Sequence, residues 1–434
     1  MSLYGALLTG VAGLAAQSEA LSVSSANIAN VDTVGYKASQ TQFATVLASS
    51  MAGGASEAGV TASPTQNVTQ AGLLQSASSP TDLAISGSGF FVTAQSATNT
   101  ANQFYTQAGD FAPDGNGNLV NSSGYYLLGY PVTTAGGVTT TSSTLAPVNV
   151  SALSGQAEPT TAITLQANLQ STSTVDAGYT AGDMAAGNVS PDFTRTIDVY
   201  DSQGGSQPLS FSFIETGANT WAYEVSYQGN AANMSSANPI HSGTLTFNSD
   251  GTLADVDGAA TPTGNVTFAV PWSAASGLAA QNITLNMGTV GSSNGMTQFD
   301  SPSTLTNASP NGASVGNLTG VTVTPNGDVT AQYSNGLNTV IYQVPIATFA
   351  NPDGLTPVSG TAYQSSNNSG AAILNTAGAG GAGSIKANEL ENSTVDINTE
   401  FTNLITSQNA YSAAARIITT ADQMLQTLDQ IPAT

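Results

Sequence analysis

Few residues of this chain could carry out chemistry, and His241 is the only imidazole among its 434 residues. It lies in a polar stretch, and the chain has no second histidine and no cysteine to complete a metal site or a nucleophile–base pair. We interpret His241 as a surface residue. The sequence therefore predicts no catalytic residue, no metal site, no cofactor and no enzymatic activity.

Two glycine-containing loops resemble ligand-binding motifs without completing them. In a calcium loop starting at Asp114, the sixth position would be Leu119 instead of Gly and the twelfth Tyr125 instead of Glu. Residues 86–89 have the look of a phosphate-binding loop, but no lysine and no helical pattern follow them. We predict a hairpin turn at 114–118 and a tight bend at 86–89.

The charge of the chain excludes nucleic acid as a partner. With 26 acidic and 4 basic residues, the net charge is −22, and no basic patch can neutralise phosphates. Only 7% of the residues are charged, so the polar surface is built from uncharged side chains and from many of the 45 glycines. No stretch of about 18 apolar residues occurs, and we expect no membrane insertion.

The composition also bears on location. Residues 1–17 lack the basic start of a cleaved signal peptide, because the first lysine is Lys37. A long, acidic chain without cysteine and rich in Ser, Thr and Gly is typical of an exposed bacterial surface protein. We expect an extracellular protein that is exported without a cleaved signal peptide.

Both ends of the chain carry apolar residues at heptad spacing, which predicts two long helices. The residues of these stripes are Leu7, Leu14, Leu21 and Ile28 at one end and Ile397, Leu404, Tyr411, Ile418 and Leu425 at the other. One contact between two helices is marginally stable, so we expect these stripes to mediate assembly with other copies. The alternative is an amphipathic helix packed on its own domain.

Between the helices the chain has β patterns. Leu209, Phe211 and Phe213 alternate with polar residues and are expected to face residues 221–227 across a turn at 217–219. The predicted fold class is α+β: terminal α-helices in a coiled-coil stalk, and two mainly antiparallel β domains, one inserted in the other. The predicted parts are a helical domain (1–31 plus 394–434), connecting segments (32–75 plus 361–393), a β domain (76–145 plus 288–360) and an inserted outer β domain (146–287).

Both terminal segments resemble the signatures of the bacterial flagellar axial protein family, which comprises rod and hook proteins. The N-terminal signature residues are Asn27, Asn30, Thr33, Gly35, Tyr36 and Lys37, and the C-terminal match runs from residue 390 to 425. Residues 320–323, 333–336 and 349–354 resemble the hook members in particular. Asp32, Gln107 and Thr394 stand where the family commonly has Asn, Arg and Asn, and Gln107 removes a salt-bridge donor.

The resemblance implies a structural subunit of the flagellar hook. Such a subunit self-assembles into a curved tubular polymer, a universal joint that transmits motor torque from rod to filament. The implied partners are other copies of the chain, the distal rod protein, the hook-associated junction proteins, the hook cap protein and the flagellar type III export apparatus. Phe43 and Leu47 match a short pattern used in that export, although packing in the connecting segment explains them equally well.

Two alternatives stay open at this point. One is the distal rod protein of the flagellar basal body, which lacks so large an insert. The other is a secreted adhesive or carbohydrate-binding β protein, in which four aromatic residues could form a sugar platform. These residues are Trp221, Tyr223, Tyr227 and Trp272, and their alternation fits a strand core better.

Overall fold

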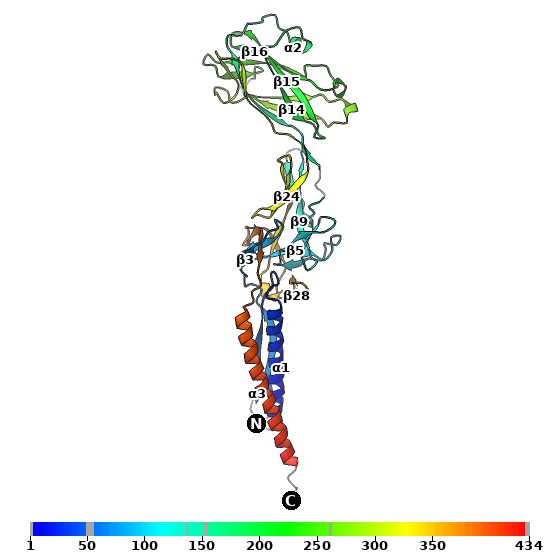
Figure 1. The fold of residues 1–434 in the computed structure, drawn as a ribbon, viewed down its shortest axis with the longest axis vertical. Coiled ribbons are helices and arrows are strands. Elements are labelled where there is room, and N and C mark those ends of the chain that lie inside the picture. The colour runs from blue at the N-terminus through cyan, green and yellow to red at the C-terminus, as the bar shows by residue number, and fades with distance from the viewer. Residues whose placement is uncertain (1–2, 49–55, 136–137, 152–154, 260–262, 430–434) are drawn as a thin grey trace. The chain divides into compact units, whose positions relative to one another are not determined.

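The computed structural model describes residues 3–48, 56–135, 138–151, 155–259 and 263–429, and the chain divides into two compact units (Figure 1). Unit 1 consists of Met1–Ala152, Gly320–Ala331 and Asn338–Thr434, and unit 2 of Leu153–Thr319 and Gln332–Leu337. The sheets are mainly antiparallel and the long helices belong to the ends of the chain, so the α+β fold class is confirmed.

Unit 2 reaches further along the chain than the predicted insert, which ended at 287. β13 (Ala162–Gln170) pairs with β21 (Thr297–Phe299) and with β22 (Thr304–Pro310), and both of these strands follow residue 287. Strands that share a ladder share a core, so unit 2 continues to Thr319. Its boundary toward unit 1 falls within β24 (Leu318–Val323) and β25 (Asp328–Tyr333).

The core of unit 2 is formed by two five-stranded sheets. One has the order β14-β15-β16-β17-β18, and in the other β13 lies between β20 and β21 and also pairs with β22. The predicted hairpin is confirmed by the register, in which Phe211 lies opposite Val225 and Phe213 opposite Tyr223. The remaining elements of unit 2 are β12 (Gln156–Glu158), α2 (Asp183–Ala186), β14 (Phe193–Tyr200), β15 (Ser206–Gly217), β16 (Thr220–Tyr227), β17 (His241–Phe247), β18 (Leu253–Val256), β19 (Asn265–Val270), β20 (Gln281–Asn286) and β23 (Ala313–Gly316).

The aromatic residues of unit 2 are core residues. Trp221 and Tyr223 are fully buried, and Trp272 packs edge-on against Tyr227 at 5.5 Å between ring centroids. They offer no exposed platform for a sugar, which removes the observation that favoured a carbohydrate-binding protein.

His241 is half-buried, contrary to the surface position predicted for it. Its Nε2 lies 3.0 Å from the Tyr223 hydroxyl, and its ring stacks on Phe268 at 5.4 Å between centroids. His241 lies on β17 opposite Val225, beside the aromatic core. No pattern in the sequence indicated this strand pairing, so the sequence could not predict that His241 is half-buried.

Unit 1 contains a sheet in which β26, β9, β5, β6, β29 and β28 are neighbours in that order. Its core includes Phe90, Tyr105 and Tyr363, packed edge to face around Phe349 and one another. Two short ladders, β3 with β32 and β4 with β31, are separate from this sheet. Apart from β24 and β25, the strands of the sheet and of these ladders are β3 (Leu74–Ser76), β4 (Leu83–Ser86), β5 (Phe90–Ala94), β6 (Phe104–Thr106), β7 (Ala112–Pro113), β8 (Leu119–Val120), β9 (Tyr126–Ala135), β10 (Val138–Thr141), β11 (Ala146–Pro147), β26 (Asn338–Gln343), β27 (Pro345–Thr348), β28 (Thr356–Val358), β29 (Ala362–Gln364), β30 (Ile373–Thr376), β31 (Ser384–Ala387) and β32 (Glu389–Glu391).

The loop at 114–118 is the hairpin turn that the sequence predicts. It joins β7 to β8, and the Asp114 carboxylate accepts hydrogen bonds from the backbone N–H groups of Asn116 and Asn118 at 2.8 and 2.9 Å. The carboxylate shapes the turn as an Asx turn does.

The two long helices are α1 (Leu3–Ala29) and α3 (Ile397–Asp429), and they run side by side in opposite directions (Figure 1). Gly10, in the first half of α1, lies beside Ile418 of α3. Asn27, near the end of α1, contacts Glu400, near the start of α3, so the two helices are antiparallel. Neither helix, within the described residues, is long and apolar enough to cross a membrane.

The first connecting segment contains more regular structure than predicted. β1 (Ser39–Ala48) and β2 (Ser56–Gln66) pair as an antiparallel hairpin that lies along α1. A Cβ added to Gly59 would lie 2.7 Å from the Ala12 Cβ, so the missing side chain lets the hairpin lie close to the helix. Low sequence complexity therefore did not preclude a strand in this segment.

Candidate functional site

Two regions of unit 1 contain the residues that the sequence singles out. The helix pair, α1 with α3, carries the heptad stripes. The junction, residues 27–39, 66–72 and 389–400, joins the helix pair to the β strands of unit 1 and contains the signature residues. All three stretches of the junction come from distant parts of the sequence.

Small residues form the contact inside the helix pair. A Cβ on Gly10 would lie 2.9 Å from Ile418 Cγ1, and a Cβ on Gly13 would lie 3.7 Å from the Ala414 Cβ. The buried apolar residues on the pair are Ala16, Ala20 and Val23 of α1 and Ala421 of α3. Small side chains on facing positions allow the two backbones to approach closely.

The nine heptad residues lie mostly at the sides of this contact. Leu7, Leu14, Leu21, Ile28, Leu404 and Ile418 are half-buried, and Ile397, Tyr411 and Leu425 are exposed. Within one chain the stripe therefore remains partly open, and its role in assembly stays a prediction.

Several large apolar residues besides the nine stripe residues are about half exposed. They are Leu8 and Val11 on α1 and Phe401, Ile405, Ile417 and Met424 on α3. Val11 lies at an intervening position of the N-terminal heptad repeat, and Phe401, Ile405 and Met424 lie in the C-terminal stretch that resembles the family. Leu8 and Ile417 have no sequence signal beyond being large and apolar.

Asn27 joins the ends of α1 and α3 to the start of β1. Its Nδ2 donates to the Ser39 carbonyl at 2.7 Å and to Glu400 Oε1 at 2.9 Å. Its Oδ1 accepts from the Ser39 N–H at 2.9 Å and from the Tyr36 hydroxyl at 3.2 Å. An amide can donate and accept at once, and fully buried Asn27 uses both capacities here.

Asn30 and Thr33 shape the end of α1. The Asn30 side chain donates to the Ala26 carbonyl at 2.9 Å, and the Thr33 hydroxyl donates to Asn30 Oδ1 at 3.2 Å. The Tyr36 N–H then donates to the Thr33 carbonyl at 3.2 Å. The Ala26 carbonyl, in the last turn of the helix, thereby gains a side-chain donor.

Gly35 turns the chain out of α1 in a backbone conformation with positive φ. Its φ is 66°, and an added Cβ would lie 2.6 Å from the Ala108 backbone nitrogen. Its own N–H donates to the Glu391 carbonyl at 2.8 Å. Only glycine combines this backbone conformation with so close a neighbour.

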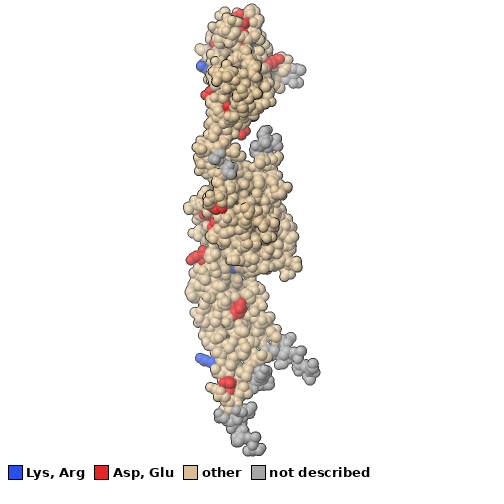
Figure 2. Space-filling view, turned by 90° about the vertical axis from the view of Figure 1, so that its right-hand side faces the viewer, with Lys and Arg blue, Asp and Glu red and all other residues tan. Residues whose placement is uncertain are grey.

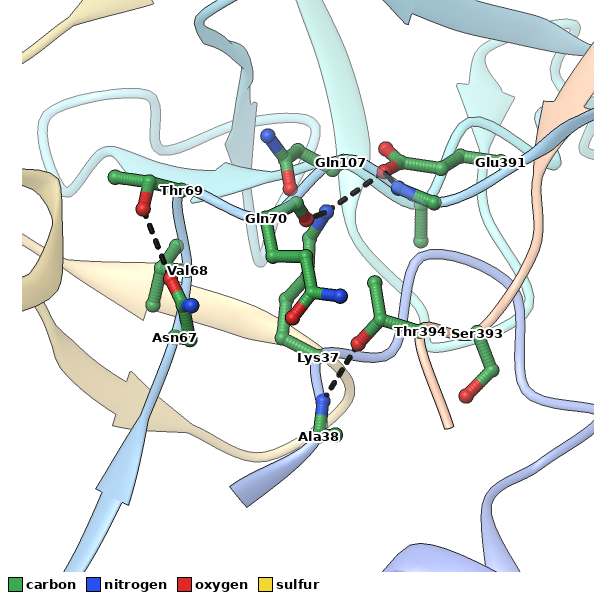
Figure 3. A network of polar contacts seen from close by, with 12 residues as sticks. Lys37, Ala38, Asn67, Val68, Thr69, Gln70, Gln107, Glu391, Ser393 and Thr394 are labelled. Carbon is green, nitrogen blue, oxygen red and sulfur yellow. Dashed lines mark hydrogen bonds and ion pairs between the residues drawn. The ribbon is translucent and has the colours of Figure 1, made fainter. Parts of the chain in front are cut away.

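Lys37 forms an ion pair at the centre of the junction (Figure 3). Its Nζ lies 2.6 Å from Glu391 Oε1 and donates to the Gln70 carbonyl at 2.7 Å, and the two charged side chains are 0% and 3% exposed. The same Glu391 oxygen accepts from the Gly72 N–H at 2.6 Å. The pair thus ties the chain leaving α1 to the chain approaching α3.

Thr394 joins the same two chain segments although the family commonly has Asn at this position. Its hydroxyl accepts from the Ala38 N–H at 2.9 Å, and its N–H donates to the Tyr36 carbonyl at 3.0 Å (Figure 3). The hydroxyl supplies the acceptor that this position requires.

The side chain of Asp396 caps the N-terminal end of α3. Its Oδ1 accepts from the N–H groups of Asn398 and Thr399 at 2.8 and 3.1 Å. A carboxylate at this position also interacts favourably with the positive end of the helix dipole.

Gln107 makes no ion pair where the family commonly has Arg. Its Nε2 donates to the Gly89 carbonyl at 3.0 Å, whereas its buried Oε1 has no hydrogen-bond partner. The salt-bridge donor expected from the family is therefore replaced by one neutral hydrogen bond.

The possible export pattern falls on β1. Phe43 is 50% exposed, and the side chain of Leu47 lies outside the described side chains. A role of this pair in export stays a prediction.

Alkaline pH is expected to destabilise unit 1. Burial raises the pKa of Tyr36, Tyr105 and Tyr363 above the ordinary value of about 10. Above that pH the unfolded chain releases these protons first, so stability falls as pH rises. Burial lowers the pKa of Lys37, although Glu391 opposes this shift. The folded chain therefore releases the Lys37 proton first, so this residue raises stability with rising pH, but only up to its ordinary pKa of about 10.4.

The measurement is the thermal midpoint of helix unfolding, followed by circular dichroism between about pH 9 and about pH 11, a range that spans the ordinary tyrosine pKa. We expect the midpoint to fall, and a Tyr363→Phe variant to show a shallower fall. An unchanged slope in this variant would contradict the assignment to Tyr363.

The part of the chain that the structure describes contains no cluster of three or more His, Asp or Glu side chains that could hold a metal. Within the same described residues, Lys37 and Glu391 form an ion pair, and His241 Nε2 lies 3.5 Å from the Asp257 carboxylate. Figure 2 shows charged side chains scattered singly over an otherwise uncharged surface. Charged side chains are therefore sparse on this surface, as expected for a chain in which only 7% of the residues are charged.

Four family models match successive parts of the chain. They are "Flagella basal body rod protein" at residues 7–37, "Flagellar hook protein FlgE/F/G D1 domain" at 84–179, "Flagellar basal body protein FlaE D2 domain" at 168–313 and "Flagellar basal body rod FlgEFG protein C-terminal" at 386–431. The matches cover the helix pair, both sides of the junction and unit 2.

Curated relatives match over nearly the full length. The chain is 36% identical to the flagellar hook protein FlgE of Brucella abortus over 99% of both chains. It is 32% identical to FlgE of Salmonella typhimurium over 96% of this chain and 98% of the other. The crystal structure of flagellar hook protein FlgE2 from Helicobacter pylori aligns at a TM-score of 0.49 and 15% identity, covering 73% of this chain and 100% of that one.

Proposed function

Since this chain belongs to the flagellar hook protein family and is a structural subunit of the hook, we propose that its helix pair drives assembly into a curved tubular polymer. The observation that carries this proposal is the set of large apolar side chains on the helix pair that the chain leaves uncovered. Leu8, Val11, Phe401 and Ile405 are 51, 54, 51 and 57% exposed. An isolated soluble chain rarely exposes so many large apolar residues, and packing against other copies would bury them.

The polymer would act as a universal joint between rod and filament. A surface with few charged residues and only four bases supports this, because few directional ion pairs between copies leave few fixed relative positions. Opposite charges introduced on facing copies should stiffen the hook, and unchanged bending in electron micrographs would contradict this role.

Family membership supports a set of partners as part of the proposal. The chain would contact other copies of itself, the distal rod protein, the hook-associated junction proteins and the hook cap protein. As part of the extracellular flagellum it would travel through the flagellar type III export apparatus without a cleaved signal peptide. Co-purification of each partner with the full-length chain tests this set, and a chain that reaches the hook without the export apparatus would refute the route.

Deleting residues 397–434 is expected to abolish assembly while leaving unit 2 folded. The deletion removes α3, so α1 loses the surface against which it packs. Electron microscopy of the truncated chain should show no tubes.

Tryptophan fluorescence supplies the internal control, because both tryptophans lie in unit 2. Their emission and urea midpoint should match those of the full-length chain. Tubes formed by the truncated chain would contradict the proposed role of the helix pair.

A further inference from the structure

Two apolar patches on the helix pair are open to solvent. The proximal patch, nearer the junction, consists of Ile397, Phe401 and Ile405, which are 41, 51 and 57% exposed. These residues are four apart on α3 and therefore share one face of the helix. The patch contains no charged residue.

The distal patch lies nearer the ends of the chain. It consists of Leu8, Val11 and Ile417, which are 51, 54 and 51% exposed. Leu8 and Val11 are three apart on α1 and share a face. Ile417 of α3 lies beside them, because its Cγ2 would be 3.7 Å from a Cβ added to the adjacent Gly10.

The distance between the patches follows from helix geometry. Gly10 lies level with Ile418, so Val11 lies level with about residue 417 of α3. Phe401 lies about 16 residues closer to the junction, and at 1.5 Å per residue the separation along the helix axis is about 24 Å.

The symmetry of a growing polymer decides how such patches can be used. A contact of one patch with the same patch of another copy is isologous, and it closes into a dimer once formed. A contact between two different patches is heterologous and can repeat without limit. A hook subunit has to repeat its contacts, which a single like-with-like contact cannot do. Alternating contacts of two like-with-like kinds would make neighbouring copies point in opposite directions, whereas a joint between rod and filament has two different ends.

We propose that the proximal patch of one copy packs against the distal patch of the next copy. Neighbouring helix pairs would then be displaced by about 24 Å along their axes. This inference rests on the proposed function and specifies which surfaces of the helix pair meet. The exposed face of α1 between the patches carries Ala15, Ser18 and Ser22, whose small uncharged side chains would let a neighbouring helix lie close.

Cysteine cross-linking tests the pairing without background, because the chain has no cysteine of its own. In assembled hooks of the variant Val11→Cys/Phe401→Cys, mild oxidation should give a ladder of covalently joined copies. A bond within one chain is excluded, since a disulfide needs Cα atoms within about 7 Å and the two positions are about 24 Å apart.

A matched control checks the oxidation chemistry. In Gly13→Cys/Ala414→Cys, the two Cβ atoms would be 3.7 Å apart, within the range of about 3.5–4.5 Å for disulfides. This variant should give a bond within each chain and only monomers on a denaturing gel.

The outcomes are distinct. Dimers from Phe401→Cys alone would show like-with-like pairing and overturn the proposal. Hooks that give the control bond but no ladder would also overturn it, while their assembly would leave the proposed function intact.

If the double variant forms no hooks, the two single variants are instead copolymerised with excess wild-type subunits. A cross-linked dimer is then expected only when both single variants are present, and its absence overturns the pairing. Wild-type subunits that form no tubes would count against the proposed function itself.

Discussion

Replacing Lys37 with methionine is expected to destabilise the junction by about 3–5 kcal/mol. The substitution leaves the Glu391 carboxylate buried, at 3% exposure, without its counter-ion. It also removes the donor to the Gln70 carbonyl. A buried charge without a partner is far less favourable than either the intact pair or a neutral replacement of both residues.

The matched control is the double variant Lys37→Met/Glu391→Gln. It removes both charges and keeps a side-chain oxygen that can accept from the Gly72 N–H, as Glu391 does at 2.6 Å. Because no charge remains unpaired, the double variant should recover most of the stability that Lys37→Met loses.

Urea unfolding followed by circular dichroism and by tryptophan fluorescence distinguishes the unfolding of the two units. Circular dichroism at the helical minimum reports mainly on α1 and α3, because α2 has only 4 residues. Tryptophan emission reports on unit 2 alone. The helical transition should move to lower urea while the tryptophan transition stays, and equal losses in the single and double variants would argue against a charge effect.

Much of the fold follows from local patterns in the sequence. The heptad spacing located both terminal helices to within a few residues of α1 and α3. Alternation of Leu209, Phe211 and Phe213 with polar residues identified β15 and its hairpin partner correctly. Such elements have one dominant periodicity, which a sequence displays directly.

The buried face of α1 was harder to predict because Ala and Gly residues of the helix lie on several of its faces. Leu7 and Leu14 mark the most apolar stripe, yet the closest approach to α3 occurs at Gly10 and Gly13. When small residues lie on several faces, close packing of backbones competes with burial of large side chains, and spacing alone does not rank the two.

The junction depended on contacts between distant residues. The family resemblance singled out Lys37, but its partner Glu391 is separated from it by 354 positions. The one available signal was a lone lysine next to Gly35 and Tyr36 in a chain with four basic residues. The limit of unit 2 was missed for the same reason, because β13 pairs with strands well over a hundred residues away.

Replacing Gly35 with alanine is expected to destabilise unit 1 by about 2–5 kcal/mol. A positive φ of 66° contributes about 1–2 kcal/mol of this for a residue with a Cβ. Overpacking against Ala108 contributes the remainder, of the order of 1–3 kcal/mol, since the added Cβ would lie 2.6 Å from a backbone nitrogen and 2.9 Å from a Cα.

The variant Gly124→Ala separates these two effects. Gly124 also has a positive φ, 84°, but an added Cβ would meet nothing within 4 Å. It should therefore lose only the backbone contribution, about 1–2 kcal/mol, in the same urea experiment. A larger loss for Gly35→Ala attributes the difference to the contact with the backbone at Ala108, and hence to the close seating of the α1 exit on unit 1. Equal losses would mean that the chain at Ala108 yields freely and that Gly35 matters for its turn alone.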